Sequence, residues 1–318
     1  MYRAYQLFLL CIVMPVVFFH SGTASANNSM IVSELLSVKV GDDTDDIKNQ
    51  FVGATIDPYE GFVVDTKGNI FISDTFNYRI LLFSKEAKLS GFYTIKNKSS
   101  FLPESLCLTE DGRLYVHNSE KEEIIVFSPD RKALKSYNPA SAFKYKYEQY
   151  HILSLSCNKM IVKVLFFIND LKIVTAYLDV YDQEFNLISK KIFYGNRGDI
   201  YEAMEKSIHG FERHFEDLYG NIYGYPLERD WIGKSLPLKM YSAQGVLLRT
   251  IDGPLLTRHT QYNVYDYYTK KVGLGEMKGK DFLIVNWHVT PSGSIYTLIA
   301  NTEYVKVLKI EEHSRPAD

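Results

Sequence analysis

The sequence lacks several features that mark common classes of protein. Only three of its 318 residues are cysteine, which is too few for a disulfide scaffold. Lys and Arg number 36 against 38 for Asp and Glu, so there is no basic surplus of the kind that a general nucleic-acid-binding protein carries. The G-x-S-x-G, Walker, C-x-x-C and H-E-x-x-H motifs are absent, so the hydrolase, kinase, redox and zincin classes that they mark have no support.

Hydrophobic runs long enough to span a bilayer are also lacking. The longest, Leu7–Phe19, has 13 residues, where a spanning helix needs about 20. Arg3 precedes this run and Ala24-Ser25-Ala26 follows it, which is the order found in a secretory signal peptide. We therefore expect cleavage near Ala26 and a secreted or periplasmic mature chain, residues 27–318, without a transmembrane segment. An uncleaved membrane anchor is the alternative.

Two cysteines, Cys107 and Cys157, remain after that cleavage. An oxidising compartment would allow them to form one internal disulfide. Both lie in apolar, strand-like runs, where a free cysteine packs as a small hydrophobic residue. The sequence therefore favours free thiols and leaves the pairing open.

The sequence does contain a repeated pattern of strands. In the clearest copy, an alternating apolar strand reaches Asp65, a tight turn ends at Gly68, and three further strands cover Asn69–Asp74, Arg79–Phe83 and Leu89–Ile95. The same order recurs around four more turns, at Gly112, 158–159, Gly220 and Gly293. Repeated four-stranded antiparallel meanders are the blades of a β-propeller, because one blade cannot bury both of its faces and stacks on the next.

The two ends of the chain predict how the ring closes. The fifth copy runs out of chain after its third strand, whereas Ile31–Val40 is a surplus strand ahead of the first blade. We therefore expect residues 27–318 to form a single all-β propeller domain whose N-terminal strand completes the last blade. Five blades are clear, and because residues 255–280 are long enough for a sixth, we expect six blades.

The first blade also carries a motif, Asp65-x-x-Gly68-Asn69-Ile-x-x-x-Asp74-Thr-x-Asn77-x-Arg79-Ile80-x-x-Phe83. This motif resembles the NHL repeat, which implies a six-bladed propeller of the exported bacterial type. The second blade keeps the spacing but replaces Asp74, Asn77 and Arg79 by Asn118, Lys121 and Glu123. NHL propellers include binding platforms, receptor ectodomains and metal-dependent lyases, so the resemblance does not select a function.

Asp74 and Arg79 flank one loop of that motif. They could pair across the loop, or Arg79 could be presented to a ligand. Because the residues of a repeat usually serve the blade, we expect the structural pairing.

The long insertions indicate which face of the propeller carries function. They cover residues 138–150, 194–211, 227–236 and 252–281, and each joins a fourth strand to the next blade or a second strand to a third. In a meander these two kinds of connection emerge on one face, which we call the loop-rich face. Long loops gathered on one face usually carry function.

These loops are rich in Tyr, Trp and Arg, the residue types that anchor interfaces. The candidate ligand-binding residues are Tyr145, Tyr147, Arg229, Trp231, Arg258, Tyr265, Tyr267 and Tyr268. The sequence thus favours a non-catalytic binding module for a protein, peptide or glycan, with no cofactor. The competing interpretation is that these side chains pack the loops onto the blades.

A second set of residues would suit an enzyme. The fourth blade has His214 and Glu216 at inner-strand positions where other blades have apolar pairs, and His288 and His117 are further inner histidines. Burying a His and a carboxylate unpaired would cost on the order of several kcal/mol. His214, Glu216 and His288 could hold a divalent metal in a lyase or hydrolase. A satisfied His–Glu pair is favoured over this, since no closely spaced ligand pair such as H-x-x-x-H occurs.

Overall fold

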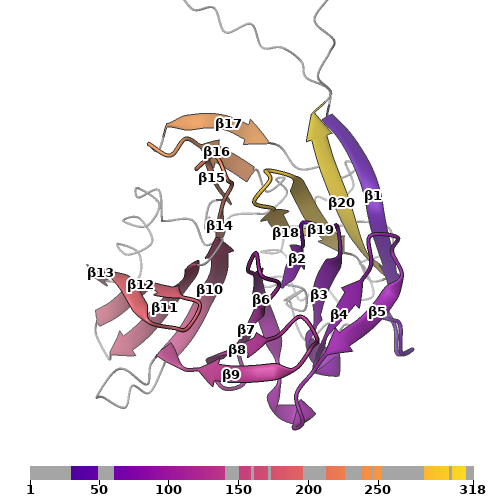
Figure 1. Cartoon of the computed structure of the whole chain (residues 1–318), viewed down its shortest axis with the longest axis horizontal. Helices are drawn as coiled ribbons and strands as arrows, with labels where there is room; N and C mark the ends of the chain where they lie inside the picture. Colours follow the sequence, from indigo (N-terminus) through magenta and orange to yellow (C-terminus); the bar gives the residue numbers. More distant parts are fainter. Residues whose placement is uncertain are drawn as a thin grey trace, which may run out of the picture.

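The fold is a β-propeller, as predicted from the sequence. Four-stranded antiparallel sheets are arranged around a central axis in the computed structural model (Figure 1). Two short 3-10 turns, η1 (Thr75–Asn77) and η2 (Lys98–Ser100), are the helical elements of the described part. No helix in that part is long and apolar enough to cross a bilayer. The structure describes residues 30–48, 61–139, 150–158, 161–170, 173–195, 213–225, 238–244, 246–251, 283–300 and 303–312.

In each of the first four blades the strands follow chain order from the axis outwards. Blade 1 consists of β2 (Phe62–Val64), β3 (Ile70–Asp74), β4 (Arg79–Phe83) and β5 (Leu89–Tyr93). Blade 2 consists of β6 (Pro103–Leu108), β7 (Leu114–Asn118), β8 (Glu123–Phe127) and β9 (Ala133–Tyr137). Blade 3 consists of β10 (Tyr150–Asn158), β11 (Ile161–Asp170), β12 (Ile173–Asp182) and β13 (Leu187–Gly195). Blade 4 consists of β14 (Arg213–Glu216), β15 (Ile222–Tyr225), β16 (Leu238–Tyr241) and β17 (Leu247–Ile251).

Blade 5 is built from both ends of the chain. Its inner three strands are β18 (Leu283–Val289), β19 (Ile295–Ala300) and β20 (Tyr304–Glu312), and its outer strand is β1 (Met30–Lys39). β1 pairs antiparallel with β20 over its whole length, from Met30 opposite Glu312 to Lys39 opposite Tyr304. The prediction that the N-terminal strand completes the last blade is confirmed.

The ring of described strands closes with five blades. The innermost strands β2, β6, β10, β14 and β18 are neighbours in this order, and β18 returns to contact β2. The described strands thus form the five blades that are clear in the sequence and not the six that we expected from the length of the chain and the NHL resemblance. Residues 255–280, considered for a sixth blade, lie outside the described residues. So do residues 199–209, where the helical spacing of the apolar residues Ile200, Ala203, Met204 and Ile208 predicts a short helix.

The apolar core lies between successive blades, because neighbouring residues of a strand point to opposite faces of its sheet. In β2, Phe62 and Val64 join the buried cluster that blade 1 shares with blade 5, which includes Leu36 of β1. Val63, between them, joins the cluster that blade 1 shares with blade 2. One three-residue strand thus contributes to two interfaces.

Short turns occupy the rim opposite the loop-rich face, which we call the short-turn face. In blade 1 the Asp65 carboxylate accepts hydrogen bonds from the backbone N–H groups of Lys67 and Asn69, both at 2.8 Å. Gly68 completes this turn at φ +87°, a conformation that glycine adopts without the steric cost of a side chain. Gly112, Gly220 and Gly293 repeat it at φ between 80° and 83°.

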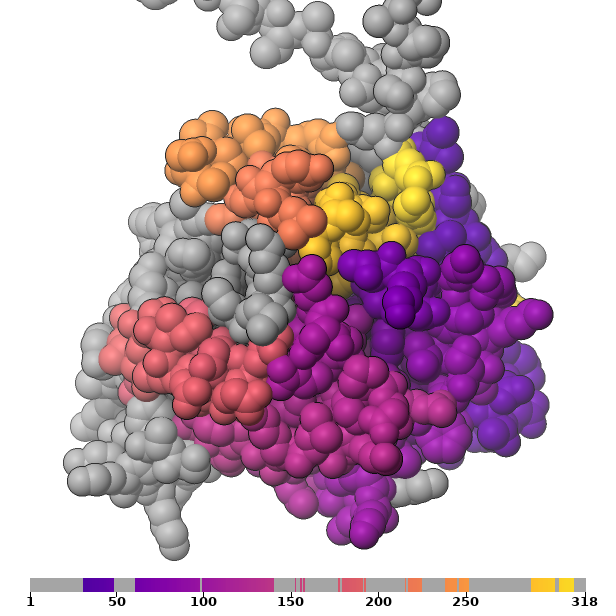
Figure 2. Space-filling model, in the orientation of Figure 1, coloured from indigo at the N-terminus to yellow at the C-terminus, as the bar shows by residue number. Residues whose placement is uncertain are grey.

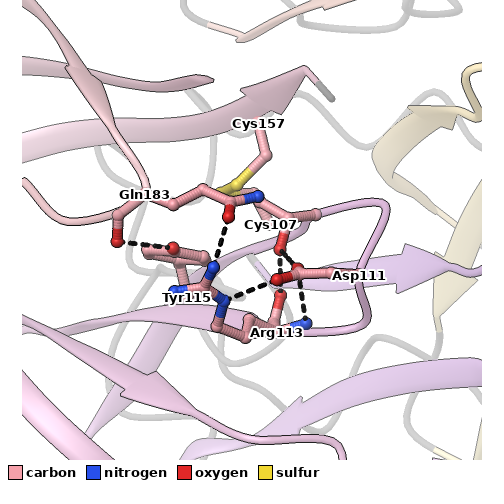
Figure 3. Close-up of a disulfide and its surroundings, with 7 residues drawn as sticks. Cys107, Asp111, Arg113, Tyr115, Cys157 and Gln183 are labelled. Atoms are coloured by element: carbon pink, nitrogen blue, oxygen red, sulfur yellow. Dashed lines mark hydrogen bonds and ion pairs between the residues drawn. A yellow bond between two sulfur atoms is a disulfide. The ribbon is translucent and has the colours of Figure 1, made fainter. Parts of the chain in front are cut away.

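Cys107 and Cys157 form a disulfide, so the preference for free thiols is wrong (Figure 3). The bond joins β6 of blade 2 to β10 of blade 3 across 50 residues of sequence, with the two Cα atoms 5.3 Å apart. Beside it, the Tyr115 hydroxyl donates to the Gln183 carbonyl oxygen at 3.2 Å, linking the same two blades. Because disulfides persist in oxidising compartments, this bond indicates an extracytoplasmic location.

Candidate functional site

The described strand ends place the long connections on one face. In every blade the inner strand begins, and the second strand ends, at the rim opposite the short turns, since neighbouring strands are antiparallel. The stretches 140–149, 196–212, 226–237 and 252–282, which lie outside the described residues, all start and finish at that rim. All eight candidate ligand-binding residues, from Tyr145 to Tyr268, fall in these stretches and stay predictions.

Asp74 and Arg79 pair across the loop, as expected. Arg79 Nε donates to the Asp74 carboxylate at 2.6 Å, and the Asp74 side chain is fully buried. Asn77 and the backbone N–H of Lys48 also donate to this carboxylate, at 2.9 and 3.0 Å. Burial raises the pKa of Asp74, while these hydrogen bonds act in the opposite direction. The pair therefore serves the blade and fixes the chain that leads into it, because Arg79 Nη2 donates to the Asp46 carbonyl oxygen as well.

Blade 2 performs the same task with an uncharged residue. The Asn118 side chain accepts a hydrogen bond from the Leu102 N–H at 2.8 Å and donates to Glu123 and to the Ser100 carbonyl oxygen, both at 3.0 Å. The segment held is again the one that leads into the inner strand of the blade. Asn118 differs from the Asp of the NHL motif at this position, but it has the same structural role as Asp74.

A buried histidine lies between two carboxylates at the loop-rich end of β7. His117 is 1% exposed, with Nε2 3.1 Å from Glu122 Oε2 and Nδ1 3.5 Å from Glu104 Oε2. Glu122 also accepts the Ile152 N–H of blade 3 at 2.8 Å. Both carboxylates are part-exposed, so they can accept hydrogen bonds from a ligand while His117 fixes their positions.

Sequence reasoning noted His117 but missed Glu104 and Glu122. The sequence did contain a signal for them. Glu104 lies at the start of an inner strand, and Glu122 lies beside the loop that joins the second strand to the third. Among the described residues, no group of three or more His, Cys, Asp or Glu side chains is arranged to hold a metal ion.

His288 lies where blade 5 meets blade 1. Its Nε2 donates to the Val64 carbonyl oxygen at 3.1 Å, and the rings of Phe62, Phe215 and Tyr296 surround it. Burial lowers the pKa of His288 to about 4, so the ring is neutral and Nδ1 carries the lone pair. Nδ1 is buried with no hydrogen-bond partner in the described part.

The predicted metal set remains a prediction. The inner strand that carries His214 and Glu216 is β14, which is a neighbour of β18, the strand of His288. The structure describes the side chain of His288 but not those of His214 and Glu216. Phe215 lies between His214 and Glu216 in the sequence, and its ring contacts the ring of His288.

Acid should weaken the contact between blades 5 and 1 through His288. Its pKa falls from an ordinary value of 6.5 to about 4 on folding, so stability is complete above pH 6.5 and is lost as pH falls towards 4. The expected loss is about 3 kcal/mol of unfolding free energy, measurable by urea titration across this pH range. Over the same pH range the unfolding free energy of the His288→Phe variant should fall by about 3 kcal/mol less than that of the parent. An identical pH dependence in both proteins would contradict the assignment.

Comparison with known proteins gives no family. No family model matches the chain, and no curated protein matches it. Similar solved structures include a DUF4221-family member from Bacteroides vulgatus, with 10% identity over 90% of this chain and 99% of that one and a TM-score of 0.41. A gluconolactonase from Xanthomonas campestris has 9% identity over 89% and 100%, with a TM-score of 0.40.

A third similar structure is the virginiamycin B lyase from Staphylococcus aureus, with 10% identity over 91% of this chain and 75% of that one and a TM-score of 0.34. At such identities a likeness concerns the fold and not the activity. The strand pairing of the described residues shows that this chain is a β-propeller, and the DUF4221 member, the gluconolactonase and the virginiamycin B lyase are solved structures to which it is similar.

Proposed function

We propose that this chain is an NHL-like propeller, exported by a signal peptide in residues 1–26, that acts as a non-catalytic binding module. The loop-rich face binds a protein, peptide or glycan through the Tyr, Trp and Arg side chains of its long loops. One observation supports this most directly: the ends of the described strands place the four long connections between them at one rim, while the connections between described strands at the opposite rim are short turns.

Substitution at the loop-rich face tests the proposal. A glycan array and an immobilised peptide library serve as probes, and any ligand found is titrated by surface plasmon resonance. We expect Trp231→Ala with Tyr267→Ala to weaken binding at least 30-fold, the effect of losing about 2 kcal/mol at an interface anchor. The melting temperature should stay within about 2 °C of the parent.

The matched control is Tyr219→Ala, which removes an exposed ring from the short-turn face and should leave binding unchanged. A large loss of stability in the Trp231/Tyr267 variant would show instead that these side chains pack the loops. Unchanged affinity would show that the ligand binds at another place on the protein.

A metal-dependent lyase or hydrolase near the central channel is the second candidate, with His214, Glu216 and His288 as ligands. The observation in its favour is the buried Nδ1 of His288, which has no partner in the described part. Elemental analysis of the purified protein distinguishes the two functions. Stoichiometric zinc or calcium that is lost in His288→Phe would support the enzyme.

A further inference from the structure

The inner strand of blade 2 has a β-bulge at the loop-rich face. The register of β6 against β7 shifts by one residue near the start of β6, so Glu104 and Ser105 together lie opposite His117. A bulge changes the direction of side chains that regular alternation would send to opposite faces of the sheet. Here the Glu104 carboxylate reaches His117, with Oε2 3.5 Å from Nδ1. The bulge therefore brings two polar residues to one buried histidine.

Ser105 is buried, and its hydroxyl has no hydrogen-bond partner in the described part. The residue is 4% exposed, and Oγ neither donates nor accepts there. Cys107, two residues further along the strand, faces blade 3, and so does Tyr115, two residues before His117. By strand alternation Ser105 and His117 therefore lie on the same face of blade 2, towards blade 3. Because a buried hydroxyl without a partner carries a desolvation penalty, it marks a place for a polar group of a ligand.

Blades 2 and 3 lie side by side, and their described parts are seen in magenta and coral in Figure 2. Glu122, in the loop between β7 and β8, is fixed between them. It accepts the Ile152 N–H of blade 3 at 2.8 Å and lies 3.1 Å from His117 Nε2. The side chains of Glu104 and Glu122 are 34% and 22% exposed, whereas that of His117 is 2% exposed. The two carboxylates thus reach solvent around a buried ring.

We call Glu104, Ser105, His117 and Glu122 the acidic corner, because its charge is negative. His117 can neutralise at most one of the two carboxylates, so the group stays negative in either protonation state of the ring. A negative group repels an anionic ligand and attracts a cationic one. No group of described residues that could hold a metal ion occurs here. An organic cation with N–H donors is the complementary ligand group, since its hydrogen bonds to carboxylates are charge-assisted.

The positions of the carboxylates favour a guanidinium over an ammonium. They lie at the two nitrogens of one imidazole ring and so diverge from each other. An ammonium is a compact point charge, whereas a guanidinium spreads five N–H donors over a planar fork. Different nitrogens of that fork can donate to Glu104 and to Glu122, which leaves a donor for the Ser105 hydroxyl.

We propose that the acidic corner binds an arginine side chain of a peptide or protein ligand. This inference rests on the proposed function, because it names a contact made by the loop-rich face, and it selects a polypeptide among the ligand classes considered there. Glu104, Ser105 and Glu122 accept hydrogen bonds from the guanidinium. His117 holds Glu122 in place between blades 2 and 3.

Titration calorimetry of the mature chain with small probes tests the inference. The probes are the Nα-acetyl amides of arginine, lysine and citrulline, and glucosamine as a cationic sugar. Citrulline has the shape of arginine, but an uncharged ureido group replaces the guanidinium. We expect the arginine probe to bind about 10-fold or more tightly than the citrulline probe, because only arginine makes charge-assisted hydrogen bonds. It should also bind more tightly than the lysine probe.

The double variant Glu104→Gln/Glu122→Gln should bind the arginine probe about 10-fold or more weakly than the parent. Glutamine keeps an oxygen that can accept the Ile152 N–H, so the contact between blades 2 and 3 is preserved. The matched control is Glu86→Gln/Glu110→Gln, which removes two exposed carboxylates of blades 1 and 2 at the short-turn face. It should bind the arginine probe within about twofold of the parent.

The Ser105→Ala variant separates a binding role of the hydroxyl from a structural one. Removing a buried hydroxyl that has no partner should leave the melting temperature unchanged or raise it. Binding of the arginine probe should fall about 3-fold or more. A lower melting temperature with unchanged binding would show that the hydroxyl serves the fold, and would overturn its place in the site.

Four results would overturn the inference as a whole. These are no binding of the arginine probe, equal affinity for arginine and citrulline, an equal loss in the Glu86/Glu110 control, and tighter binding of glucosamine than of arginine. The last would identify an amino sugar of a glycan as the ligand group. The proposed function fails separately, since it is tested by the effect of Trp231→Ala and Tyr267→Ala on ligands from the array and the library.

Discussion

Replacing Leu36 by Asp should prevent closure of the ring and leave most of the protein unfolded. Leu36 lies in β1 and is 3% exposed, in the cluster that joins the outer strand of blade 5 to Phe62 and Val64 of blade 1. A carboxylate there would be buried without a partner, at a cost on the order of several kcal/mol. Since domains have about 5–15 kcal/mol of stability in all, urea unfolding should show a greatly lowered midpoint or no transition.

Ser37→Asp is the matched control, because Ser37 is the next residue of the same strand and is exposed. Its unfolding free energy should remain within about 0.5 kcal/mol of the parent. The role of β1 in closing the ring would be refuted if both variants unfolded at the same urea concentration as the parent. Equal destabilisation of the Leu36→Asp and Ser37→Asp variants would also refute this role of β1, because the two side chains would then not point to opposite faces of the sheet.

Removing the disulfide should be the next most damaging change. The bond between Cys107 and Cys157 closes a loop of about 50 residues, for which the chain-entropy estimate is about 4 kcal/mol of unfolding free energy. The double variant Cys107→Ala/Cys157→Ala should therefore unfold at a clearly lower urea concentration. The parent protein in dithiothreitol should shift in the same direction.

The double variant supplies the control for the reductant. It has no disulfide to lose, so dithiothreitol should not move its unfolding midpoint. Thiol titration of the unreduced parent under denaturing conditions should find neither Cys107 nor Cys157 reactive. Two reactive thiols, together with no effect of dithiothreitol on the parent, would restore the interpretation that the sequence favoured.

Much of the architecture could be predicted because its causes are local. Alternation of apolar and polar residues defines the strands, and Gly68 and Gly112 mark turns that need a positive φ. Counting strands along the chain leaves one surplus strand at the start and one missing at the end, which predicts the pairing of β1 with β20. The Asp74–Arg79 pair also follows from a spacing of five residues within one hairpin.

The features that relate one blade to another could not be predicted in this way. Whether Cys107 meets Cys157, whether Glu122 accepts the Ile152 N–H of blade 3, and which carbonyl His288 reaches all depend on the stagger and tilt of neighbouring sheets. The number of blades in the ring is set by the same geometry. Strand patterns fix which residues face inwards within a sheet, but only packing in three dimensions decides which residues of different sheets come into contact.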